Sequence, residues 1–423
     1  SRKNCGPLSE GSDPSDLKLI APVGQERPVN EVVEVSYDQF LDTYEDKFSD
    51  SWKEPYLLFE TSRGCWWGAK AHCTFCGLNG GNMGYRAIAA PKALALLKSL
   101  FDRYAHRVNH FSCVDNIIPK EYFTDVFPLL EVPENVSIFY EVKADLTEEQ
   151  MQILSDTHIS QIQPGIESLD TTTLKLMRKG TTSFGNIRLL KYCLLYNIEP
   201  IWNLLIGFPG EQEETYIRYA RILPNLYHLP PPSGIFPVRF DRYSPYFTRA
   251  EEYKLDLHPL DYYSFIYPFD RQTIARMAYY FTDHNYNSDY NVLAAKWIHD
   301  LKMIVDTWLD KWKHPEAAPR LFISNEEGRC EVVDTRSGQL LKYPLTPAAE
   351  SILAALGTHK NTKALMDDLS HLPEALITSE LAYLFAKGLV FEEKGSMLSL
   401  IVNVDNATLP AIVNGNVVEE SRA

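Results

Sequence analysis

The chain has 423 residues, of which 45% are apolar and 12% aromatic, enough for one large domain and a smaller one. No apolar run reaches the roughly 18 residues that a membrane helix needs, and the N-terminus lacks the apolar region of a signal peptide. The formal charge of −15 argues against nucleic acid as the main partner, because that affinity comes largely from Lys and Arg side chains that neutralise phosphates.

From residue 56 onward the sequence repeats a strand, loop and helix pattern, after a polar and proline-containing lead-in over residues 1–50 with one amphipathic segment at 37–44. Helices are predicted at 90–105, 119–130, 170–178 and 184–196, and another begins at Thr147, with Gln150 in the capping-box position. The predicted strands are 56–60, 108–114, 136–142, 159–166, 199–206 and 238–244. Such alternation predicts an α/β fold with a parallel sheet, and six repeats favour an open (βα)₆ partial TIM barrel.

The C-terminal third changes character. Residues 270–312 predict helices, and 320–335 predict a hairpin that turns at Glu327–Gly328. Three helices (347–356, 361–370, 374–387) and two strands (389–394, 397–402) then follow in the order of a winged helix, an α+β domain that we expect to pack or to bind peptide. The expected parts are a lead-in (1–50), the barrel (51–285), a helical and hairpin bridge (286–340), the winged-helix-like domain (341–404) and a tail (405–423).

Cys65, Cys73 and Cys76 lie close together in the sequence, and glycines follow them. Four thiolates would close a zinc site, whereas three can hold a [4Fe–4S] cluster and leave one iron open to a small ligand. A zinc site or incidental thiols are the alternatives, but no second Cys-x-x-Cys pair occurs in the chain. The total of seven cysteines is odd and does not suggest a secreted disulfide framework, so we expect a reducing, cytoplasmic setting.

The glycines and polar residues of the barrel region are concentrated where its strands are predicted to end. They occupy residues 60–86, 115–116, 141–145, 165–168, 203–211 and 241–246. In parallel α/β folds the ligand lies at the carboxyl ends of the strands. The sequence therefore predicts a ligand site at this edge, beside the three cysteines.

Several motifs in residues 35–285 carry a resemblance to one family. They are Glu60-Thr-Ser-Arg-Gly-Cys-Trp-Trp-Gly, Cys73-Thr-Phe-Cys-Gly-Leu-Asn-Gly, Tyr140-Glu-Val-Lys-Ala, Gln163-Pro-Gly-Ile-Glu-Ser, Asn203-Leu-Leu-Ile-Gly-Phe-Pro-Gly-Glu and Asp241-Arg-Tyr-Ser-Pro-Tyr-Phe. The chain resembles the radical S-adenosylmethionine (SAM) superfamily. Within it, the chain resembles the maturases of ribosomally made, post-translationally modified peptides (RiPPs), a group named for its C-methyltransferases that has peptide-splicing relatives.

The resemblance implies a [4Fe–4S] cluster on Cys65, Cys73 and Cys76 whose open iron binds the amino and carboxylate groups of SAM. One electron then cleaves SAM to methionine and a 5′-deoxyadenosyl radical that abstracts a substrate hydrogen. The further SAM contacts that it implies are Phe75 and Asn203 with the backbone at Gly207 (adenine), Asp115 and Asn116 (amino group), Glu141 and Lys143 (ribose and carboxylate), and Glu167, Ser168 and Arg178 (methionine or ribose). Asp241, Tyr243 and Tyr246 are peptide-side candidates. Strand-end Glu and Lys residues could instead pair with each other or cap helices, and Trp66 and Trp67 could serve only packing.

The resemblance implies partners as well: a ribosomal precursor peptide with a leader, and reduced ferredoxin or flavodoxin as electron donor. A separate leader-recognition protein is a further candidate, whereas nucleic acid and membrane are not expected. Only 64 residues precede Cys65, and they lack the Asp-x-His-x-x-Gly loop that marks the cobalamin-binding domain of many C-methylating relatives. We therefore expect direct radical chemistry on the peptide, including backbone excision.

Three other functions stay open. The chain could be a cobalamin-dependent peptide C-methyltransferase whose cobalamin domain is missing from it. It could also be a non-catalytic peptide-binding partner with a structural Fe–S cluster. DNA regulation through the winged helix is the most distant alternative.

Overall fold

The central feature of the fold is a five-stranded parallel sheet, with strand order β1-β4-β5-β6-β7. The computed structural model describes residues 28–31, 35–48, 54–80, 83–314, 317–326, 329–403 and 417–419. The strands are β1 (Tyr56–Phe59), β4 (His110–Cys113), β5 (Ser137–Glu141), β6 (Gln161–Gln163) and β7 (Glu199–Pro200). Neighbouring strands place Leu57 opposite Phe111 and Phe111 opposite Ile138, and these residues are buried. The predicted parallel α/β sheet is thus confirmed.

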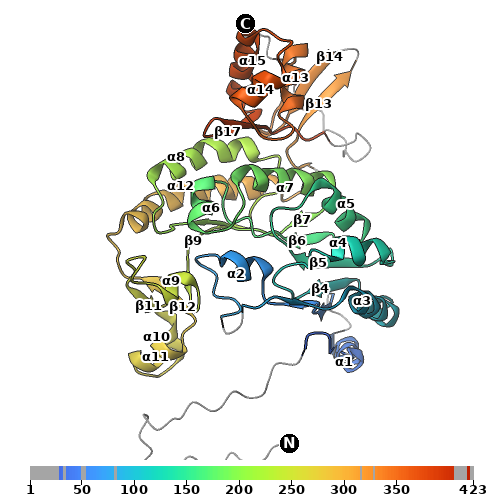
Figure 1. Ribbon diagram of the computed structural model, residues 1–423, viewed down its shortest axis with the longest axis vertical. Helices are drawn as coiled ribbons and strands as arrows, with labels where there is room; N and C mark the ends of the chain where they lie inside the picture. Colours follow the sequence, from blue (N-terminus) through green and yellow to red (C-terminus); the bar gives the residue numbers. More distant parts are fainter. Residues whose placement is uncertain are drawn as a thin grey trace, which may run out of the picture.

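Helical crossovers join these strands, as parallel pairing requires (Figure 1). The crossover elements are α3 (Ala90–Tyr104), α4 (Tyr122–Asp125), η2 (Phe127–Leu129), α5 (Glu148–Asp156), α6 (Thr171–Leu176) and α7 (Ser183–Leu195). The predicted capping box of α5 is present, with both the Thr147 and the Gln150 side-chain hydrogen bonds formed. Before the sheet, α1 (Asp38–Phe48) covers the predicted amphipathic segment and buries Leu41.

The predicted strand 199–206 is interrupted. Of the predicted strand 238–244 only β10 (Phe240–Asp241) forms, and it belongs to a separate antiparallel sheet. The first divides into β7 and β8 (Leu204–Ile206), and β8 pairs in parallel with β9 (Ile235–Pro237). A single parallel bridge between Glu167 and Leu204 links β8 to the end of β6. Strand β9 escaped prediction because it has only three residues, follows a run of prolines at 230–232 and itself ends at Pro237, which has no N–H to donate to the ladder. Two further elements precede β9, namely α8 (Glu213–Ile222) and η3 (Leu223–Leu226).

Two predicted helical stretches also differ from the structure. The stretch 119–130 divides into α4 and η2, because Pro128 lacks the N–H that a continuous helix would use. The stretch 270–312 contains a strand, β12 (Tyr280–Asp283), between α11 (Arg271–Met277) and α12 (Asp289–Lys311). Strand β12 is the central strand of a small antiparallel sheet, so its partners rather than its local pattern determine its conformation.

That small sheet belongs to a unit that we call the lobe, residues 240–283, drawn at the lower left in Figure 1. Its elements are β10 (Phe240–Asp241), α9 (Pro245–Thr248), β11 (Leu257–Pro259), α10 (Tyr262–Ile266), α11 and β12. Strand β12 pairs with β10 on one side and β11 on the other. Phe240, Tyr246 and Phe281 of the lobe share a core with Leu174 and Met177 around α6, which fixes the lobe against the sheet domain.

The C-terminal part stands above α7 and α8 in Figure 1. The hairpin β13 (Leu321–Glu326) and β14 (Arg329–Asp334) forms as predicted, although its turn residues 327–328 lie outside the described residues. Strand β15 (Leu340–Pro344), which was not predicted, joins it. The elements α13 (Pro347–Ala355), β16 (Lys360–Asn361), α14 (Thr362–Asp368), α15 (Glu374–Ala386), β17 (Val390–Glu393) and β18 (Ser396–Ser399) then follow in the predicted order of three helices and a hairpin. Of the predicted tail, the structure describes only β19 (Val417–Glu419), which pairs with β15.

Polar contacts connect the C-terminal part to the sheet domain. Glu393 on β17, whose side chain is 2% exposed, forms an ion pair with Arg218 on α8 at 2.6 Å. Its carboxylate also accepts hydrogen bonds from the Thr171 amide at 2.9 Å and the Ser183 hydroxyl at 2.7 Å. Among the described helices none is long and apolar enough to cross a membrane.

Replacing Glu393 with Ala should lower the free energy of unfolding by about 3 kcal/mol. The substitution removes one of the two carboxylates that pair with the largely buried Arg218 guanidinium, the other being Asp170, and it leaves the Thr171 amide without its acceptor. Chemical denaturation followed by circular dichroism would measure the loss. The matched control is Glu131→Ala, which removes an exposed carboxylate from a loop and should change stability by less than about 0.5 kcal/mol. Equal effects of the two substitutions would show that the Glu393 contacts do not stabilise the fold.

Candidate active site

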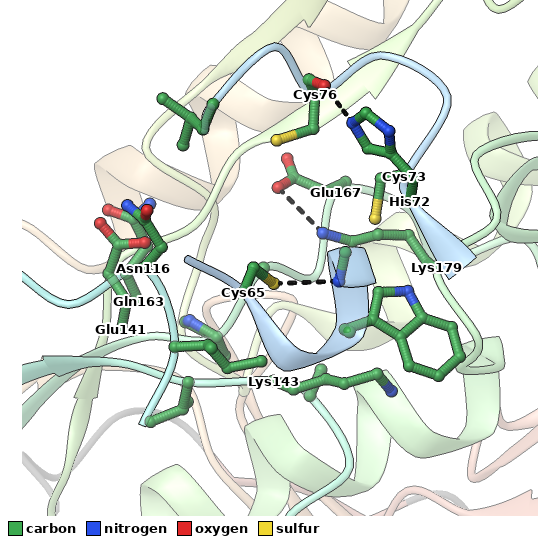
Figure 2. A pocket seen from close by; sticks show the side chains of 18 of the residues that line it. Cys65, His72, Cys73, Cys76, Asn116, Glu141, Lys143, Gln163, Glu167 and Lys179 are labelled. Atoms are coloured by element: carbon green, nitrogen blue, oxygen red, sulfur yellow. Dashed lines mark hydrogen bonds and ion pairs between the residues drawn. The ribbon is translucent and has the colours of Figure 1, made fainter. Parts of the chain in front are cut away.

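A cavity of about 190 Å³ lies at the carboxyl ends of β1, β4, β5 and β6 (Figure 2). All three clustered cysteines line it, together with residues from the ends of three neighbouring strands. The lining residues that matter below are Cys65, Trp67, Cys73, Phe75, Cys76, Asn79, Asn116, Glu141, Lys143, Gln163, Glu167 and Lys179. The edge at which sequence analysis placed the ligand site is therefore the edge that carries the cavity.

Cys65 is the N-cap of a six-residue helix, α2 (Trp66–Ala71), between the short strands β2 (Ser62–Arg63) and β3 (Arg86–Ala87). The Gly68 amide donates a hydrogen bond to the Cys65 sulfur at 3.3 Å. The helix ends at His72, whose Nε2–H donates to the Cys76 carbonyl oxygen at 2.9 Å. His72 thus joins the helix that carries the first cysteine to the turn that carries the other two.

Cys73 and Cys76 stand on either side of Thr74, which is 1% exposed. The Thr74 amide donates to the Met177 carbonyl at 3.0 Å, and its hydroxyl donates to the Leu176 carbonyl at 3.0 Å. The Thr74 carbonyl accepts a hydrogen bond from the Tyr246 amide at 2.9 Å. The cysteine turn is therefore attached both to the end of α6 and to the lobe.

The thiols themselves are free, and none of the three forms a disulfide. Burial raises the pKa of the Cys73 thiol and raises that of Cys76 to about 11. Within the described part of the chain no three His, Cys, Asp or Glu side chains lie close enough to bind a single metal ion. A four-iron cluster places its thiolates on separate iron atoms, so this spread of soft donors around one cavity fits a cluster better than a single zinc ion.

Lys179 is the main cation among these thiols. Its Nζ lies 3.4 Å from Glu167 Oε1 and 5.6 Å from the centroid of the Phe75 ring. Burial lowers the pKa of Lys179, but the charges of Glu167, Cys73 and Cys76 outweigh burial, so the net shift is upward. An ammonium held in this way would stabilise thiolates or an anionic group of a ligand.

A second set of polar residues lies on the opposite side of the cavity, where Figure 2 shows Asn116, Glu141 and Gln163 near one another. Asn116 accepts a hydrogen bond from the Asn79 side chain at 2.8 Å. Burial, aided by the charge of Asp115, raises the pKa of Glu141 to about 7. Lys143 donates to Asp145 at 3.1 Å and to the Gly180 carbonyl at 3.2 Å.

Five other SAM-contact candidates do not line the cavity. The carboxylate of Asp115 accepts hydrogen bonds from the Thr61 amide and hydroxyl. Ser168 is buried against the Tyr219 hydroxyl at 2.7 Å, and the Gly207 amide donates to Glu211 at 2.7 Å. Arg178 and Asn203 have exposed side chains. Their roles toward SAM stay predictions.

The three peptide-side candidates also differ in how far their side chains are available to a ligand. Asp241 is paired with Arg239 at 2.8 Å, and Tyr246 is 1% exposed within the core that the lobe shares with α6. Tyr243 is 48% exposed, and its ring packs closely against Gly80 of the cysteine loop. Of the three, Tyr243 is the one that offers surface beside the cavity.

Sequence analysis missed Lys179, Trp67, Asn79 and Gln163 as lining residues. For Lys179 the available signal was its place directly after Arg178, in the loop between α6 and α7. Arg178 has a left-handed backbone with φ of 56°, which turns its side chain to solvent while the next residue enters the cavity. Adjacent basic residues cannot be distinguished without this backbone geometry.

Residues 59–223 match the family described as the radical SAM superfamily. Such a domain uses a [4Fe–4S] cluster and SAM, which is the cofactor set that the three-thiol cavity fits. A search of curated protein sequences found no match.

Among solved structures, the chain is similar to the cobalamin-dependent SAM radical enzyme OxsB, with 22% identity, a TM-score of 0.33, and coverage of 40% of this chain and 26% of OxsB. The radical SAM methyltransferase TsrM from Kitasatospora setae, with cobalamin and a [4Fe–4S] cluster bound, shares 17% identity at a TM-score of 0.39, covering 47% of this chain and 37% of TsrM. Coproporphyrinogen III oxidase (HemN) from Escherichia coli shares 13% identity at a TM-score of 0.35, covering 88% of this chain and 90% of HemN. The chain thus spans less than half of OxsB and of TsrM, and their activities are their own.

Glu141 gives the protein a specific pH dependence. Its pKa is raised from 4.5 to about 7 in the folded state, so between these values the folded protein binds more protons than the unfolded chain. Stability of the iron-free protein should therefore fall as pH rises through this window. Glu141→Gln should remove that part of the fall, which urea denaturation at several pH values would measure. The exposed control Glu374→Gln should retain the wild-type slope, and a Glu141→Gln slope equal to wild type would contradict the prediction.

Proposed function

We propose that this chain, which carries a radical SAM domain, cleaves SAM reductively and uses the resulting radical to modify a ribosomally made precursor peptide. The proposed cleavage of SAM is supported by one observation: Cys65, Cys73 and Cys76 all line a single cavity at the strand ends. The chemistry that a bound cluster supplies is the electron that splits the sulfonium of SAM into methionine and a 5′-deoxyadenosyl radical. We also infer that β9 is the sixth strand of an open partial barrel around this cavity, and that residues 341–404 form a winged-helix-like domain.

The chain's own residues would orient SAM around the cluster. Lys179 offers an ammonium to the SAM carboxylate, and Phe75 offers an apolar wall beside it. Asn116 and Glu141 face the cavity from the other side and supply hydrogen-bond partners for the ribose or the amino group. These contacts would hold the sulfonium in one orientation, so that only one of its bonds is cleaved.

The peptide half of the proposal is supported by the aromatic surface of the lobe. Phe265 is 84% exposed, Phe269 is 52% exposed and Tyr267 is 36% exposed. The Tyr267 ring stacks at 6.4 Å on Tyr263, whose hydroxyl accepts a hydrogen bond from the Tyr279 amide at 3.0 Å.

The same row of aromatic side chains extends to the cysteine loop, part of which lines the cavity. The Tyr279 ring lies 6.5 Å from that of Tyr243, which packs against Gly80 of the cysteine loop. Exposed apolar surface of this kind marks a binding face. We expect an extended peptide with apolar side chains to follow these aromatics from α10 toward the cysteine loop, which would bring the target residue near the site of radical formation.

Cys73→Ser should reduce SAM cleavage to the level of protein without iron, because it removes one thiolate of the cluster. Anaerobic reconstitution, reduction and quantification of 5′-deoxyadenosine would measure this. Cys330→Ser is the matched control, since Cys330 lies on β14 outside the cavity, and its cleavage rate should equal that of wild type. Full cleavage by Cys73→Ser protein would overturn the radical SAM assignment of this site.

Co-expression with the precursor peptide encoded beside its gene, followed by mass spectrometry, tests the peptide half. Excision, epimerisation, cross-linking and methylation differ in mass or fragmentation, and a methyl gain that requires added cobalamin would support the alternative C-methyltransferase.

Phe265→Ser should raise the KM for the peptide by about tenfold, the usual effect of losing one interface aromatic. This substitution should leave SAM cleavage in the absence of peptide unchanged. The matched control is Phe48→Ser on α1, at a position that is 57% exposed. The control should retain both the wild-type KM and the wild-type rate of peptide-free SAM cleavage. An unmodified peptide alongside active SAM cleavage would contradict a peptide substrate.

A further inference from the structure

We propose that Trp66 and Trp67 act together as a clamp that positions Cys65 relative to Cys73 and Cys76. Both indoles are partly buried, and both belong to helix α2 directly after Cys65. This inference concerns how the cluster site is held together and does not depend on what the radical is used for.

Helix α2 cannot hold its own position. It has six residues, and none of them is buried, so no side chain anchors it in a core. An isolated helix shorter than about 12 residues is marginal in water. The position of Cys65 at the N-terminus of this helix must therefore come from contacts that α2 makes with other parts of the domain.

Trp66 supplies the contact on one side. Its Nε1–H donates to the Ile118 carbonyl oxygen at 3.1 Å, in the loop that follows β4. Ile118 is itself fixed, because its amide donates to the Glu141 carbonyl at the end of β5 at 2.9 Å. The Lys120 ammonium lies 4.0 Å from the centroid of the Trp66 ring and covers its outer face. Trp66 thus ties α2 to the ends of two strands.

Trp67 supplies the contact on the other side. Its Nε1–H donates to the Arg178 carbonyl oxygen at 3.0 Å, in the loop between α6 and α7. The Lys143 ammonium lies 4.6 Å from the centroid of its ring and also donates to the Gly180 carbonyl at 3.2 Å. Gly180, with φ of +63°, leaves room for the indole, since a Cβ there would lie 2.1 Å from the Trp67 ring. The loop is therefore shaped around Trp67.

The two rings stand at 90° to each other, with centroids 6.5 Å apart. Their hydrogen bonds therefore restrain α2 from two directions, toward the loops after β4 and after α6. Cys73 and Cys76 have a separate anchor, because Thr74 between them is bonded to the end of α6. The His72–Cys76 hydrogen bond links α2 directly to the cysteine turn, and the tryptophan clamp adds the two contacts that fix α2, and with it the first thiol, against the strand ends and the loop after α6.

A clamp and simple surface packing predict different behaviour for Trp→Phe substitutions. Phenylalanine keeps an apolar ring but removes the indole N–H and its hydrogen bond. Trp66→Phe and Trp67→Phe should each speed the loss of iron from the reconstituted protein to a chelator by about fivefold, as loss of one hydrogen bond of ordinary net strength would do. The double variant should lose iron about 25-fold faster if the two contacts are independent.

The control for these variants is Trp312→Phe. Its Nε1–H donates to the Tyr227 carbonyl at 2.8 Å, the same kind of contact, but Trp312 lies at the end of α12 and its hydrogen bond ties that helix, and not α2, to a neighbouring segment. Its melting temperature should fall about as much as those of the Trp66 and Trp67 variants, while its iron loss stays at the wild-type rate. If the Trp66 and Trp67 variants also lose iron at the wild-type rate, the clamp is wrong.

A second set of variants tests the fit of Trp67 without altering any tryptophan hydrogen bond directly. Gly180→Ala should push the indole out of place and speed iron loss, whereas Gly395→Ala is the matched control. Gly395 also has a left-handed backbone, with φ of +77°, but a Cβ there has no atom within 4 Å. In a Trp67→Ala background the Gly180→Ala change should add no further effect. An equal effect of Gly180→Ala in both backgrounds would attribute iron loss to backbone strain and overturn the proposal.

Discussion

Three hydrogen bonds at Thr74 connect the parts of the molecule on which the cavity depends. They join the turn of Cys73 and Cys76 to the end of α6 and to the first residues of α9. Thr74 is almost fully buried, so these bonds do not compete with water and must be made for the turn to pack. The positions of two thiols are therefore determined by the same contacts that hold the lobe against the sheet domain. The lobe is held beside the cysteine turn because it shares this anchor.

The charge of the cavity follows from the thiols that surround it. The chain as a whole has a formal charge of −15, yet Lys143 and Lys179 both reach the cavity. A buried ammonium is costly unless it is paired, and Lys179 has Glu167 and two thiols as its neighbours. Burial alone raises the pKa of the thiols, and a nearby cation acts in the opposite direction by favouring the thiolate form. Although the protein is acidic overall, basic side chains thus lie where they can pair with cluster-bound thiolates and with a ligand that carries a carboxylate.

The sequence predicted those features of the fold that are encoded locally. The cysteine spacing, the Thr147 capping box and the concentration of polar residues at strand ends are all visible in short segments. The failures were nonlocal. Strand β9 has three residues and ends in a proline, and it is a strand only because β8 lies beside it. Strand β12 was hidden in a helical region because its two antiparallel partners, β10 and β11, come from elsewhere in the chain. In both cases pairing with a distant segment overrides a weak local pattern.

Prediction of the site failed in a more systematic way, because polar residues at the strand ends come in adjacent pairs. Successive side chains in an extended segment point to opposite faces, and a left-handed residue such as Glu167, with φ of 58°, also turns its side chain away from that of its neighbour. One member of a pair can therefore face the cavity while the next faces away from it. Asn116 and Glu167 line the cavity, whereas Asp115 bonds to Thr61 and Ser168 packs against Tyr219. The residues that face away from the cavity also have a structural role, because each connects a strand end to a neighbouring element through a hydrogen bond. A motif read from sequence combines both members, and so it names ligand contacts together with the anchors that hold them.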